Sequence, residues 1–401
     1  MRVLHVIPSV APRYGGPSRA VIEMCRALRQ DGVDTLIATT DADGGGHLSV
    51  ELGRPVSFSD VPAIFFPRQW SEAYKYSRPL ARWLEENVRD FDVVHIHAVF
   101  SHACLTASRA CRHHGVPYVV RPLGTLDPWS LRQKRFRKRV FWYLGVRRML
   151  MRAATIHYTT QSERELVAES FELERGTVIP LGVEERLLAV TKAAENSTVE
   201  AESFDGHPYA LVLSRLHRKK GLELLLPAFL SLVKRPEFAE WRLVLAGDGD
   251  AGYVASLRQL AQAGAGNGHV IFAGWLGGAR RQAVLQQSSL LALTSYQENF
   301  GLCAIEALAC GVPVLISPQV NLAPEIEAAG AGWVVPLEQT ALENALAEIL
   351  RDAPARARRG AVGRELVRRR FVWDAIAAEL EALYVSVKPT ASAQTRDSLV
   401  S

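Results

Sequence analysis

The sequence has few cysteines and no long apolar run. Its 401 residues include five cysteines, and none of them forms a Cys-x-x-Cys pair. We therefore expect reduced cysteines in the core of a cytoplasmic protein, not a disulfide framework or a zinc site. No apolar stretch approaches the roughly 20 residues that cross a bilayer. The N-terminal apolar run, Val3–Ile7, is too short for a signal peptide.

Repeats, low-complexity tracts and a strong overall charge are also missing. The formal net charge is only +5, and no recognisable nucleic-acid-binding fold surrounds the basic residues, so no nucleic-acid partner is expected. The loop after the first predicted strand reads Arg13-Tyr-Gly-Gly-Pro17. It is not the Gly-x-Gly-x-x-Gly fingerprint of a nicotinamide site, which disfavours such a site in the N-terminal half.

Short apolar runs alternate with helical segments along most of the chain. This alternation predicts parallel sheets and, because it occurs twice, two doubly wound α/β domains. Between the two runs lies a polar, acidic stretch that is typical of a linker. The predicted parts are a first domain at 1–190, a linker at 191–207, a second domain at 208–370, a C-terminal helix at 371–387 that packs back on the first domain, and a polar tail at 388–401.

The stretch from Thr294 to Val314 combines a strand end, a loop and a helix. The strand ends near Leu293, and the helix begins near Leu302. Glu298 lies in the loop and Glu306 lies about one turn into the helix. Backbone N–H groups of Asn299, Phe300, Gly301 and Leu302 would form a helix N-terminus, which favours anions. Taken alone, the spacing fits two incidental surface glutamates equally well.

A basic turn follows the first strand of the second domain. The strand 210–214 delivers Arg215 at its carboxyl end, and Lys220 precedes Gly221, where a helix opens. Two cations beside a helix N-terminus suit a diphosphate. The alternative is a solvated basic turn.

Two further features of the first domain could contact ligands. Gly15 and Gly16 lie at a strand-to-helix turn, where glycines let the backbone approach a ligand, although an ordinary tight turn would look the same. His95 and His97 share one face of a strand. His97, nearer the strand end, is our candidate for binding acceptor hydroxyls, and hydrogen-bonded histidines within the sheet are the alternative.

Two Asp-x-Asp pairs lie in glycine-rich loops. Asp248 and Asp250 form one pair, and Asp41 and Asp43 form the other. Aspartates in such loops usually serve turns and helix caps, so we expect no metal at either pair.

A basic segment covers residues 132–152. It holds nine Lys and Arg residues interleaved with Phe, Trp, Leu and Met. This pattern predicts an amphipathic basic helix that can lie on anionic lipid. A solvated face on an ordinary domain helix is the alternative.

Taken together, these motifs resemble the retaining, nucleotide-sugar-dependent glycosyltransferases with the two-domain GT-B fold, the large family marked by a Glu-x7-Glu pair. The resemblance covers nearly the whole chain. The matching segments are Gly15-Gly16, Arg215-Leu216 with Lys220-Gly221, Gly247-Asp-Gly249, Glu298 with Phe300-Gly-Leu302 and Glu306, Cys310-Gly311 with Pro313-Val314, and Phe371-Val-Trp373.

A narrower likeness is to bacterial glycosyltransferases of exopolysaccharide and lipopolysaccharide assembly. It is carried by Gly124-Thr-Leu-Asp-Pro-Trp-Ser130, by the basic segment and by Thr159-Thr-Gln-Ser-Glu163. There are two departures. The loop Arg121-Pro-Leu-Gly-Thr125 lacks a histidine that many relatives carry, and Pro180-Leu-Gly-Val183 replaces the family's Pro-Asn-Gly-Val.

The resemblance implies a GT-B fold in which the two domains face a cleft. The nucleotide-sugar would bind the second domain, and a glycan or lipid-linked acceptor would bind the first. Glu306 would accept hydrogen bonds from the ribose hydroxyls and Glu298 would reach the sugar, while Arg215 and Lys220 would stabilise the diphosphate.

No cofactor and no metal are implied. The expected location is the cytoplasm, with contact to the inner membrane if the acceptor is lipid-linked. Two alternatives stay open: a nucleotide-sugar epimerase on the same fold and a non-catalytic partner subunit.

Overall fold

The computed structural model describes residues 1–133, 135–171, 173, 175–189, 204, 206–264 and 268–388. The chain divides into two compact units. The first contains Met1–Gly182 and the chain from Trp373 onward, and the second contains Val183–Val372. The predicted linker 191–207 and tail 388–401 lie largely outside the described residues.

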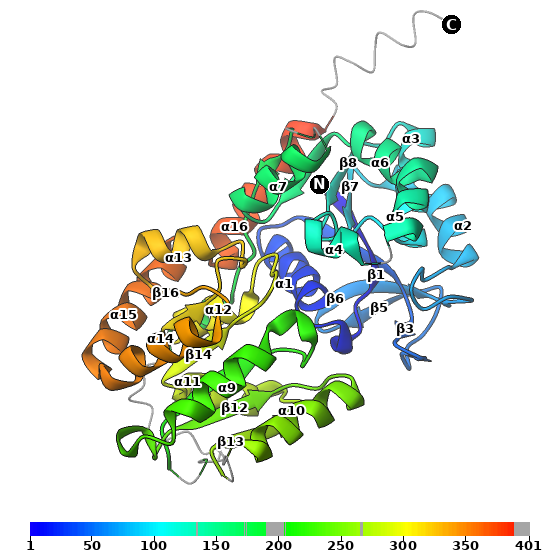
Figure 1. Cartoon of the computed structure of the whole chain (residues 1–401). Coiled ribbons are helices and arrows are strands. Elements are labelled where there is room, and N and C mark those ends of the chain that lie inside the picture. The colour runs from blue at the N-terminus through cyan, green and yellow to red at the C-terminus, as the bar shows by residue number, and fades with distance from the viewer. Residues whose placement is uncertain are drawn as a thin grey trace, which may run out of the picture. The chain divides into compact units, whose positions relative to one another are not determined.

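The first unit is built on an eight-stranded sheet with helices on both faces (Figure 1). All neighbouring strands are parallel except the pair β5–β6, which is antiparallel. In sheet order the strands are β10 (Thr177–Val178), β9 (Thr155–Tyr158), β8 (Tyr118–Arg121), β7 (Val93–His97), β1 (Arg2–Ser9), β2 (Asp34–Thr40), β6 (Val61–Phe66) and β5 (Pro55–Phe58). A separate two-stranded ladder joins β3 (Ala42–Asp43) and β4 (Gly46–His47).

The helices of this unit follow the strands along the chain. They are α1 (Gly16–Gln30), α2 (Arg78–Asn87), α3 (His102–His114), α4 (Pro128–Arg132), α5 (Arg135–Phe141), the π-helix η3 (Trp142–Val146), α6 (Arg147–Arg152), α7 (Gln161–Phe171) and α16 (Trp373–Val387), with short 3-10 turns η1 (Pro12–Tyr14) and η2 (Val88–Asp90). The last of them, α16, packs against α1, where the Trp373 indole donates to Glu23 at 3.0 Å.

The second unit is a six-stranded, fully parallel sheet. Its strands in sheet order are β13 (Val270–Gly274), β12 (Arg242–Ala246), β11 (Tyr209–Leu213), β14 (Leu290–Leu293), β15 (Val314–Ile316) and β16 (Gly332–Val334). Its helices are α8 (Arg186–Ala189), α9 (Leu222–Leu232), α10 (Ala251–Ala263), α11 (Gly278–Gln287), α12 (Leu302–Ala309), α13 (Ala323–Ala329), α14 (Gln339–Arg351) and α15 (Ala353–Arg370), with 3-10 turns η4 (Arg218–Lys220) and η5 (Pro236–Phe238).

Continuous apolar runs explain why these strands form. β11, β12 and β14 are buried along almost their full length, which is the pattern of a parallel sheet covered on both faces. The α/β prediction with parallel sheets is therefore confirmed. The chain crosses from one unit to the other twice, after Gly182 and after Val372. Next to these crossings, Val183 N–H donates to the Phe371 carbonyl at 2.8 Å.

The prediction of one amphipathic helix over the basic segment is wrong. The segment is divided into α5, η3 and α6, with a non-helical residue at Gly145. Its apolar residues do not share one face, because Met149 is buried in the core while Phe136 is 81% exposed. Lys134 lies outside the described residues.

Candidate functional site

The candidate donor site lies where β11 and β14 end. These strands are parallel neighbours in the sheet of the second unit, so the loops after them leave from the same edge. The loop after β11 carries Arg215 and Lys220, and the loop after β14 carries Glu298. The topology therefore brings together residues that are about 80 positions apart in the sequence.

Lys220 and Glu298 form an ion pair, with side chains 16% and 21% exposed. The Lys220 carbonyl accepts a hydrogen bond from the Thr294 hydroxyl at 3.1 Å. Gly221 has a φ of +62°, and a Cβ there would lie 2.2 Å from the Thr294 carbonyl oxygen. Only glycine fits this close approach, which explains the Lys-Gly sequence at the start of α9.

Backbone hydrogen bonds fix the Glu298 loop on two sides. Glu298 N–H donates to Gln319 O at 3.0 Å, and Asn321 N–H donates to Glu298 O at 3.0 Å. On the other side, Tyr296 N–H donates to Lys219 O at 2.8 Å. These neighbouring segments thus hold the loop in place.

The site is electropositive. Burial raises the pKa of Glu298, but the nearby Lys220, Lys219 and Arg215 outweigh it, so the pKa lies below its usual value and Glu298 is ionised at neutral pH. The pKa of His217 is lowered, first by burial and then by Arg215 and the neighbouring lysines. An anionic ligand would relieve this crowding of cations.

The helix α12 begins beside Glu298. Its N-cap is Gly301, with a φ of +80°, and no side chain caps the helix. Phe300 is buried and packs edge-on against Phe371 at a ring distance of 5.9 Å. Asn299 and Leu302 flank this turn and are partly exposed. The turn therefore presents the N-terminal end of a helix at the same edge as the two cations.

Glu306 is paired with an arginine that the sequence analysis missed. Glu306 is 2% exposed, and Arg281 of α11 contacts both its carboxylate oxygens, with Nη1 3.1 Å from Oε1. The sequence did contain one signal. Arg280 and Arg281 lie in the first turn of a helix, where cations are unfavourable, so a nearby carboxylate could have been inferred.

The remaining predicted residues lie in the first unit. Gly15 is the N-cap of α1, with a φ of +75°, and Gly16 is exposed at its first position. His97 is fully buried, and its Nε2 lies 3.0 Å from Nδ1 of His5. His95 lies in the same cluster, so the expectation that both histidines share a face holds. The acceptor role of His97 stays a prediction.

Three of the four aspartates in the Asp-x-Asp pairs make local contacts. Asp250 caps α10 by accepting from Tyr253 N–H at 3.1 Å. Asp41 accepts from Arg68 N–H at 2.7 Å, and Asp43 pairs with Arg13.

Two groups among the described residues have ligand atoms close enough to share a metal ion. They are His5–His95–His97 and Glu85–His113–His114. Both belong to the first unit, so neither includes a residue of the candidate donor site.

Within the described residues, no helix is long and apolar enough to cross a bilayer.

Family models match both units of the chain. The family model for glycosyl transferases group 1 matches residues 194–366, and the model for the glycosyl transferase 4-like domain matches residues 15–182.

Two curated relatives match most of the chain. A GDP-mannose:cellobiosyl-diphosphopolyprenol alpha-mannosyltransferase of Xanthomonas oryzae pv. oryzae is 27% identical, covering 84% of this chain and 83% of the relative. A mannosylfructose-phosphate synthase of Agrobacterium fabrum is 24% identical, covering 94% and 87%.

Solved structures share the fold. HepE of Anabaena, in complex with UDP and glucose, has a TM-score of 0.77 at 21% identity, covering 96% of this chain and all of that one. Sucrose-phosphate synthase of Thermosynechococcus elongatus has a TM-score of 0.75 at 21% identity, covering 96% and 99%. Two family models that together span both units, and a fold shared over nearly the whole length, lead to one conclusion: the chain belongs to the group 1 glycosyltransferases and has the GT-B fold.

Proposed function

We propose that this glycosyltransferase is a retaining, metal-independent enzyme that transfers a sugar from a UDP- or GDP-linked donor to a lipid-linked glycan during assembly of a bacterial cell-surface polysaccharide. The observation that supports this most is the cluster of Arg215, Lys220 and Glu298 beside the start of α12. Such a cluster provides cations for a diphosphate and a carboxylate for sugar hydroxyls at one sheet edge.

In the proposed reaction, the bond between the anomeric carbon and the diphosphate oxygen breaks. The acceptor oxygen bonds to the same face of the sugar, and its proton passes to the departing phosphate oxygen. Lys220 and Arg215 stabilise the charge that develops on this leaving group. Glu306, oriented by Arg281, binds the ribose, and amides around Gly301 face the negative charge. Gly16 lets the first loop of the acceptor domain approach the diphosphate.

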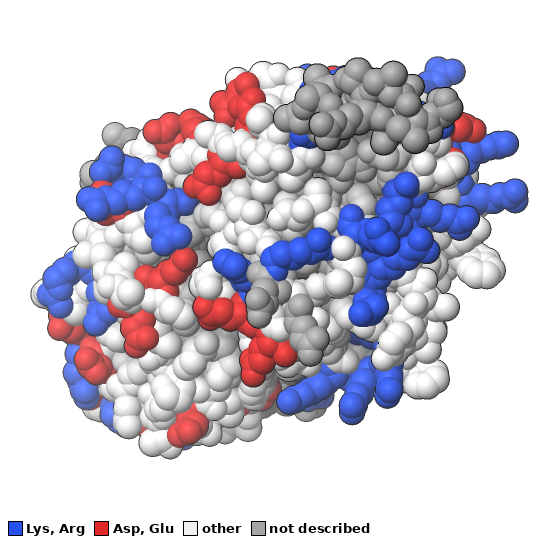
Figure 2. Space-filling view, turned by 90° about the horizontal axis from the view of Figure 1, so that it is seen from above, with Lys and Arg blue, Asp and Glu red and all other residues white. Residues whose placement is uncertain are grey.

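The exposed side chains of the basic segment support a lipid-linked acceptor. Exposed arginines alternate there with the large apolar side chains of Phe136, Tyr143 and Leu144, which are 72–81% exposed. Figure 2 shows Lys and Arg side chains crowded together on the face seen from above, with few acidic neighbours. Exposed apolar residues among cations suit insertion between anionic headgroups. The Xanthomonas relative acts, by its name, on a diphosphopolyprenol acceptor.

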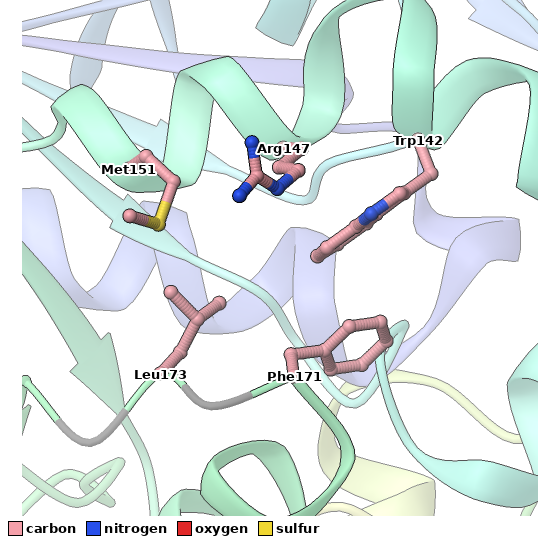
Figure 3. A pocket seen from close by; sticks show the side chains of 5 residues that line it. All are labelled: Trp142, Arg147, Met151, Phe171 and Leu173. Carbon is pink, nitrogen blue, oxygen red and sulfur yellow. The ribbon is translucent and has the colours of Figure 1, made fainter.

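A small pocket lies under this segment. Trp142, Arg147 and Met151 line one side of it, and Phe171 and Leu173 line the other (Figure 3). Its volume of about 80 Å³ is well below the roughly 300 Å³ at which small-molecule sites begin. It is therefore too small for a nucleotide-sugar.

Nucleotide release is the test of the donor site. Wild type is incubated with GDP-mannose and UDP-glucose, with and without a short-chain polyprenyl-diphosphate glycan. We expect release with one donor, and a loss of about 100- to 1000-fold in Lys220→Ala, the effect of removing one transition-state donor. Lys234→Ala, an exposed lysine of the same unit, is the matched control and keeps wild-type activity.

Three outcomes would contradict the proposal. If wild type and Lys220→Ala release nucleotide equally with every combination of donor and acceptor, the protein is a non-catalytic subunit. Conversion of the donor sugar to its epimer without transfer would identify an epimerase. Inversion of the anomeric centre in the product, or loss of activity in EDTA, would remove the retaining or the metal-independent part of the proposal.

Membrane binding has a separate test, co-sedimentation with anionic vesicles. Replacing Arg135, Arg137 and Arg139 by Gln should weaken binding at least tenfold, because each cation near such a surface contributes about 1 kcal/mol. The control replaces Arg358, Arg368 and Arg369 of the second unit, which removes the same charge. Equal binding by both variants would refute the membrane contact.

A further inference from the structure

The loop between β6 and α2, residues 67–77, presents a tryptophan to solvent from a rigid frame. Gln69 N–H donates to Tyr76 O at 2.9 Å and closes the loop, and the Gln69 side chain accepts from Arg78 N–H at 2.8 Å. Trp70, near its tip, is 72% exposed. A large aromatic side chain on a fixed loop loses little entropy when a ligand binds, so Trp70 is a candidate ligand contact.

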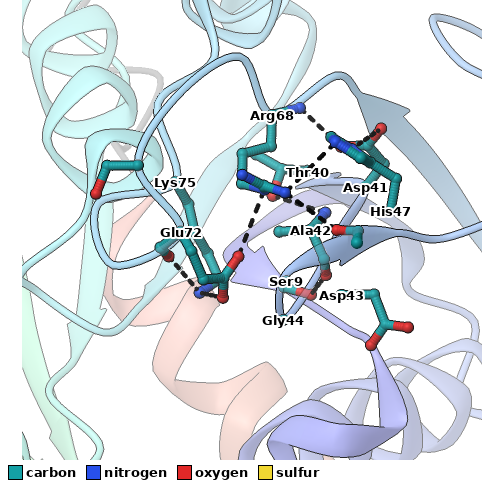
Figure 4. Close-up of polar contacts among 12 residues, drawn as sticks. Ser9, Thr40, Asp41, Ala42, Asp43, Gly44, His47, Arg68, Glu72 and Lys75 are labelled. Atoms are coloured by element: carbon teal, nitrogen blue, oxygen red, sulfur yellow. Dashed lines mark hydrogen bonds and ion pairs between the residues drawn. The ribbon is translucent and has the colours of Figure 1, made fainter.

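Charged side chains hold this loop in place. Arg68, whose side chain is 11% exposed, donates to the Trp70 carbonyl at 2.8 Å and to Gly46 O at 3.1 Å. The backbone N–H of Arg68 donates to Asp41, and the guanidinium Nε lies 3.4 Å from Oε2 of Glu72 (Figure 4). These contacts fix the position of the Trp70 backbone.

The same network reaches the first loop of the unit. Glu72 accepts from the Tyr14 hydroxyl and from Lys75 Nζ at 2.9 Å, and Lys75 lies over the Tyr14 ring at 4.3 Å. Tyr14 immediately precedes Gly15. The loops after β1, β2 and β6 are thus joined at the carboxyl ends of three neighbouring strands, which is the edge where doubly wound sheets bind ligands.

The charges of this network compensate one another. Two cations, Arg68 and Lys75, face two carboxylates, Glu72 and Asp41. These four side chains together carry no net charge, which favours a neutral polar ligand over a phosphate or an anionic headgroup.

Aromatic contacts extend the surface toward the basic segment. The Trp70 ring lies 5.4 Å from Tyr76, and Tyr76 lies 4.4 Å from His102. Tyr74 stacks on Phe141 of α5 at 5.0 Å. The loop is therefore physically connected to the segment that the proposed function places on the membrane.

We infer that Trp70 and Tyr76 form a subsite for a neutral sugar ring of the acceptor. A pyranose has an apolar C–H face that stacks on an indole, and its hydroxyls lie at the rim, where polar groups of the loop are available. The inference rests on the proposed function in one respect, since it takes the sugar to be part of the acceptor. It adds that the enzyme recognises the glycan itself and not only the lipid that carries it.

The first experiment does not require catalysis. Saturation-transfer NMR is recorded with intact protein and two neutral disaccharides, cellobiose and maltose, using wild type, Trp70→Ala and Trp275→Ala. Trp275, 62% exposed in the second unit, is the matched control. We expect transfer to at least one disaccharide in wild type and Trp275→Ala, and a reduction of at least tenfold in affinity in Trp70→Ala, as for truncation of an interface tryptophan.

The second experiment separates acceptor from donor effects. Trp70→Ala should raise the acceptor KM about tenfold, while donor hydrolysis without acceptor stays unchanged and Trp70→Phe restores most of the loss. An acceptor KM within twofold of wild type, or equal disaccharide binding in Trp70→Ala, overturns the inference. Loss of anionic vesicle binding alone would overturn it in favour of a membrane anchor. If wild type turns over no donor, the proposed function fails, and the NMR experiment still decides whether the sugar subsite exists.

Discussion

The two units place their polar groups differently on similar sheets. In the second unit, charged side chains lie at the strand ends and remain partly accessible, as in the pair of Lys220 and Glu298. The first unit also has charged side chains at its strand ends, such as Arg68 and Glu72, but it holds a further group of titratable side chains inside the sheet. His5, His95, His97, His157 and Arg121 come from four strands and are all fully buried. Similar sheets therefore carry an ionised site at a sheet edge in the second unit and a layer of buried, neutral histidines in the first.

Hydrogen bonds define the protonation of this layer. His157 Nε2 faces the Ile179 carbonyl at 2.8 Å and must donate, so in the neutral ring Nδ1 accepts from His95 Nε2 at 3.3 Å. The remaining nitrogen of His95 then accepts from the Tyr384 hydroxyl at 2.8 Å. Burial, and then the charge of Arg121, lowers the pKa of His157 to about 3. The chain of bonds is consistent with neutral rings throughout.

The largest expected effect is acid destabilisation of the first unit. Burial lowers the pKa of His5 and His157 to about 3, and those of His95 and His97 lie well below 6.5. The unfolded chain binds protons below pH 6.5 while the folded unit does not, so stability is present above that pH and is lost as the pH falls toward 3. Each histidine lowers the free energy of unfolding by about 1.4 kcal/mol per pH unit below 6.5, which amounts to ~6 kcal/mol for four histidines at pH 5.5.

Hydrogen exchange at pH 7.5 and 5.5 would measure this difference unit by unit. His5→Gln should remove about a quarter of the pH slope, and His269→Gln in the second unit should leave it unchanged. If exchange in the first unit is no more pH-sensitive than in the second, the buried histidines take up protons in the folded state. The two units would then not differ in this respect.

The next effect concerns the pair of Arg281 and Glu306. Arg281→Ala leaves a carboxylate that is 2% exposed without its partner. Because the arginine itself is 25% exposed, we expect a loss of roughly 2–3 kcal/mol, below the roughly 3–5 kcal/mol of a fully buried pair. Urea unfolding gives this number, and the double variant Arg281→Ala/Glu306→Ala should recover part of it.

Donor affinity distinguishes two roles of the same pair. If Arg281 positions Glu306 for the ribose, Arg281→Lys should weaken nucleotide binding more than it weakens folding, since lysine cannot contact both oxygens. If the Arg281→Lys variant has reduced stability and unchanged nucleotide affinity, the pair of Arg281 and Glu306 has only a structural role.

The smallest effect tests whether Asp250 belongs to the site or to the scaffold. Asp250→Ala should cost about 1 kcal/mol through loss of the α10 cap. Asp250→Asn keeps the cap and should retain both stability and transferase activity. If the asparagine variant folds normally but loses activity, the carboxylate has a ligand role that the hydrogen bonding does not reveal.

The sequence predicted the strands well where both faces are covered. β14 ends at Leu293 as predicted, and β11 lies within one residue of the predicted strand 210–214, because an unbroken apolar run leaves few alternatives. The loops that carry Lys220 and Glu298 were located for the same reason, since they follow such strands. The antiparallel edge β5 was missed because its exposed, mixed sequence carries no comparable signal.

Residues whose role depends on distant packing were not predictable. The sequence showed that His95 and His97 share a face but not that α16, almost 300 positions later, lies against it. Arg281 was missed because its partner is on another helix. The basic segment was predicted as one helix because charged and apolar residues alternate through it. Of its described residues, the fully buried ones are Val146, Met149 and Leu150.

The position of α16 has a consequence for synthesis. The first unit is discontinuous in the chain, since its last helix follows the whole of the second unit. On the ribosome, β7 and β9 are made before the whole second unit, and Tyr384, whose hydroxyl completes the His95–His157 chain, is made after it. The second unit is continuous in the chain and can finish folding before the first. Completion of the histidine layer therefore waits until the second unit has been synthesised.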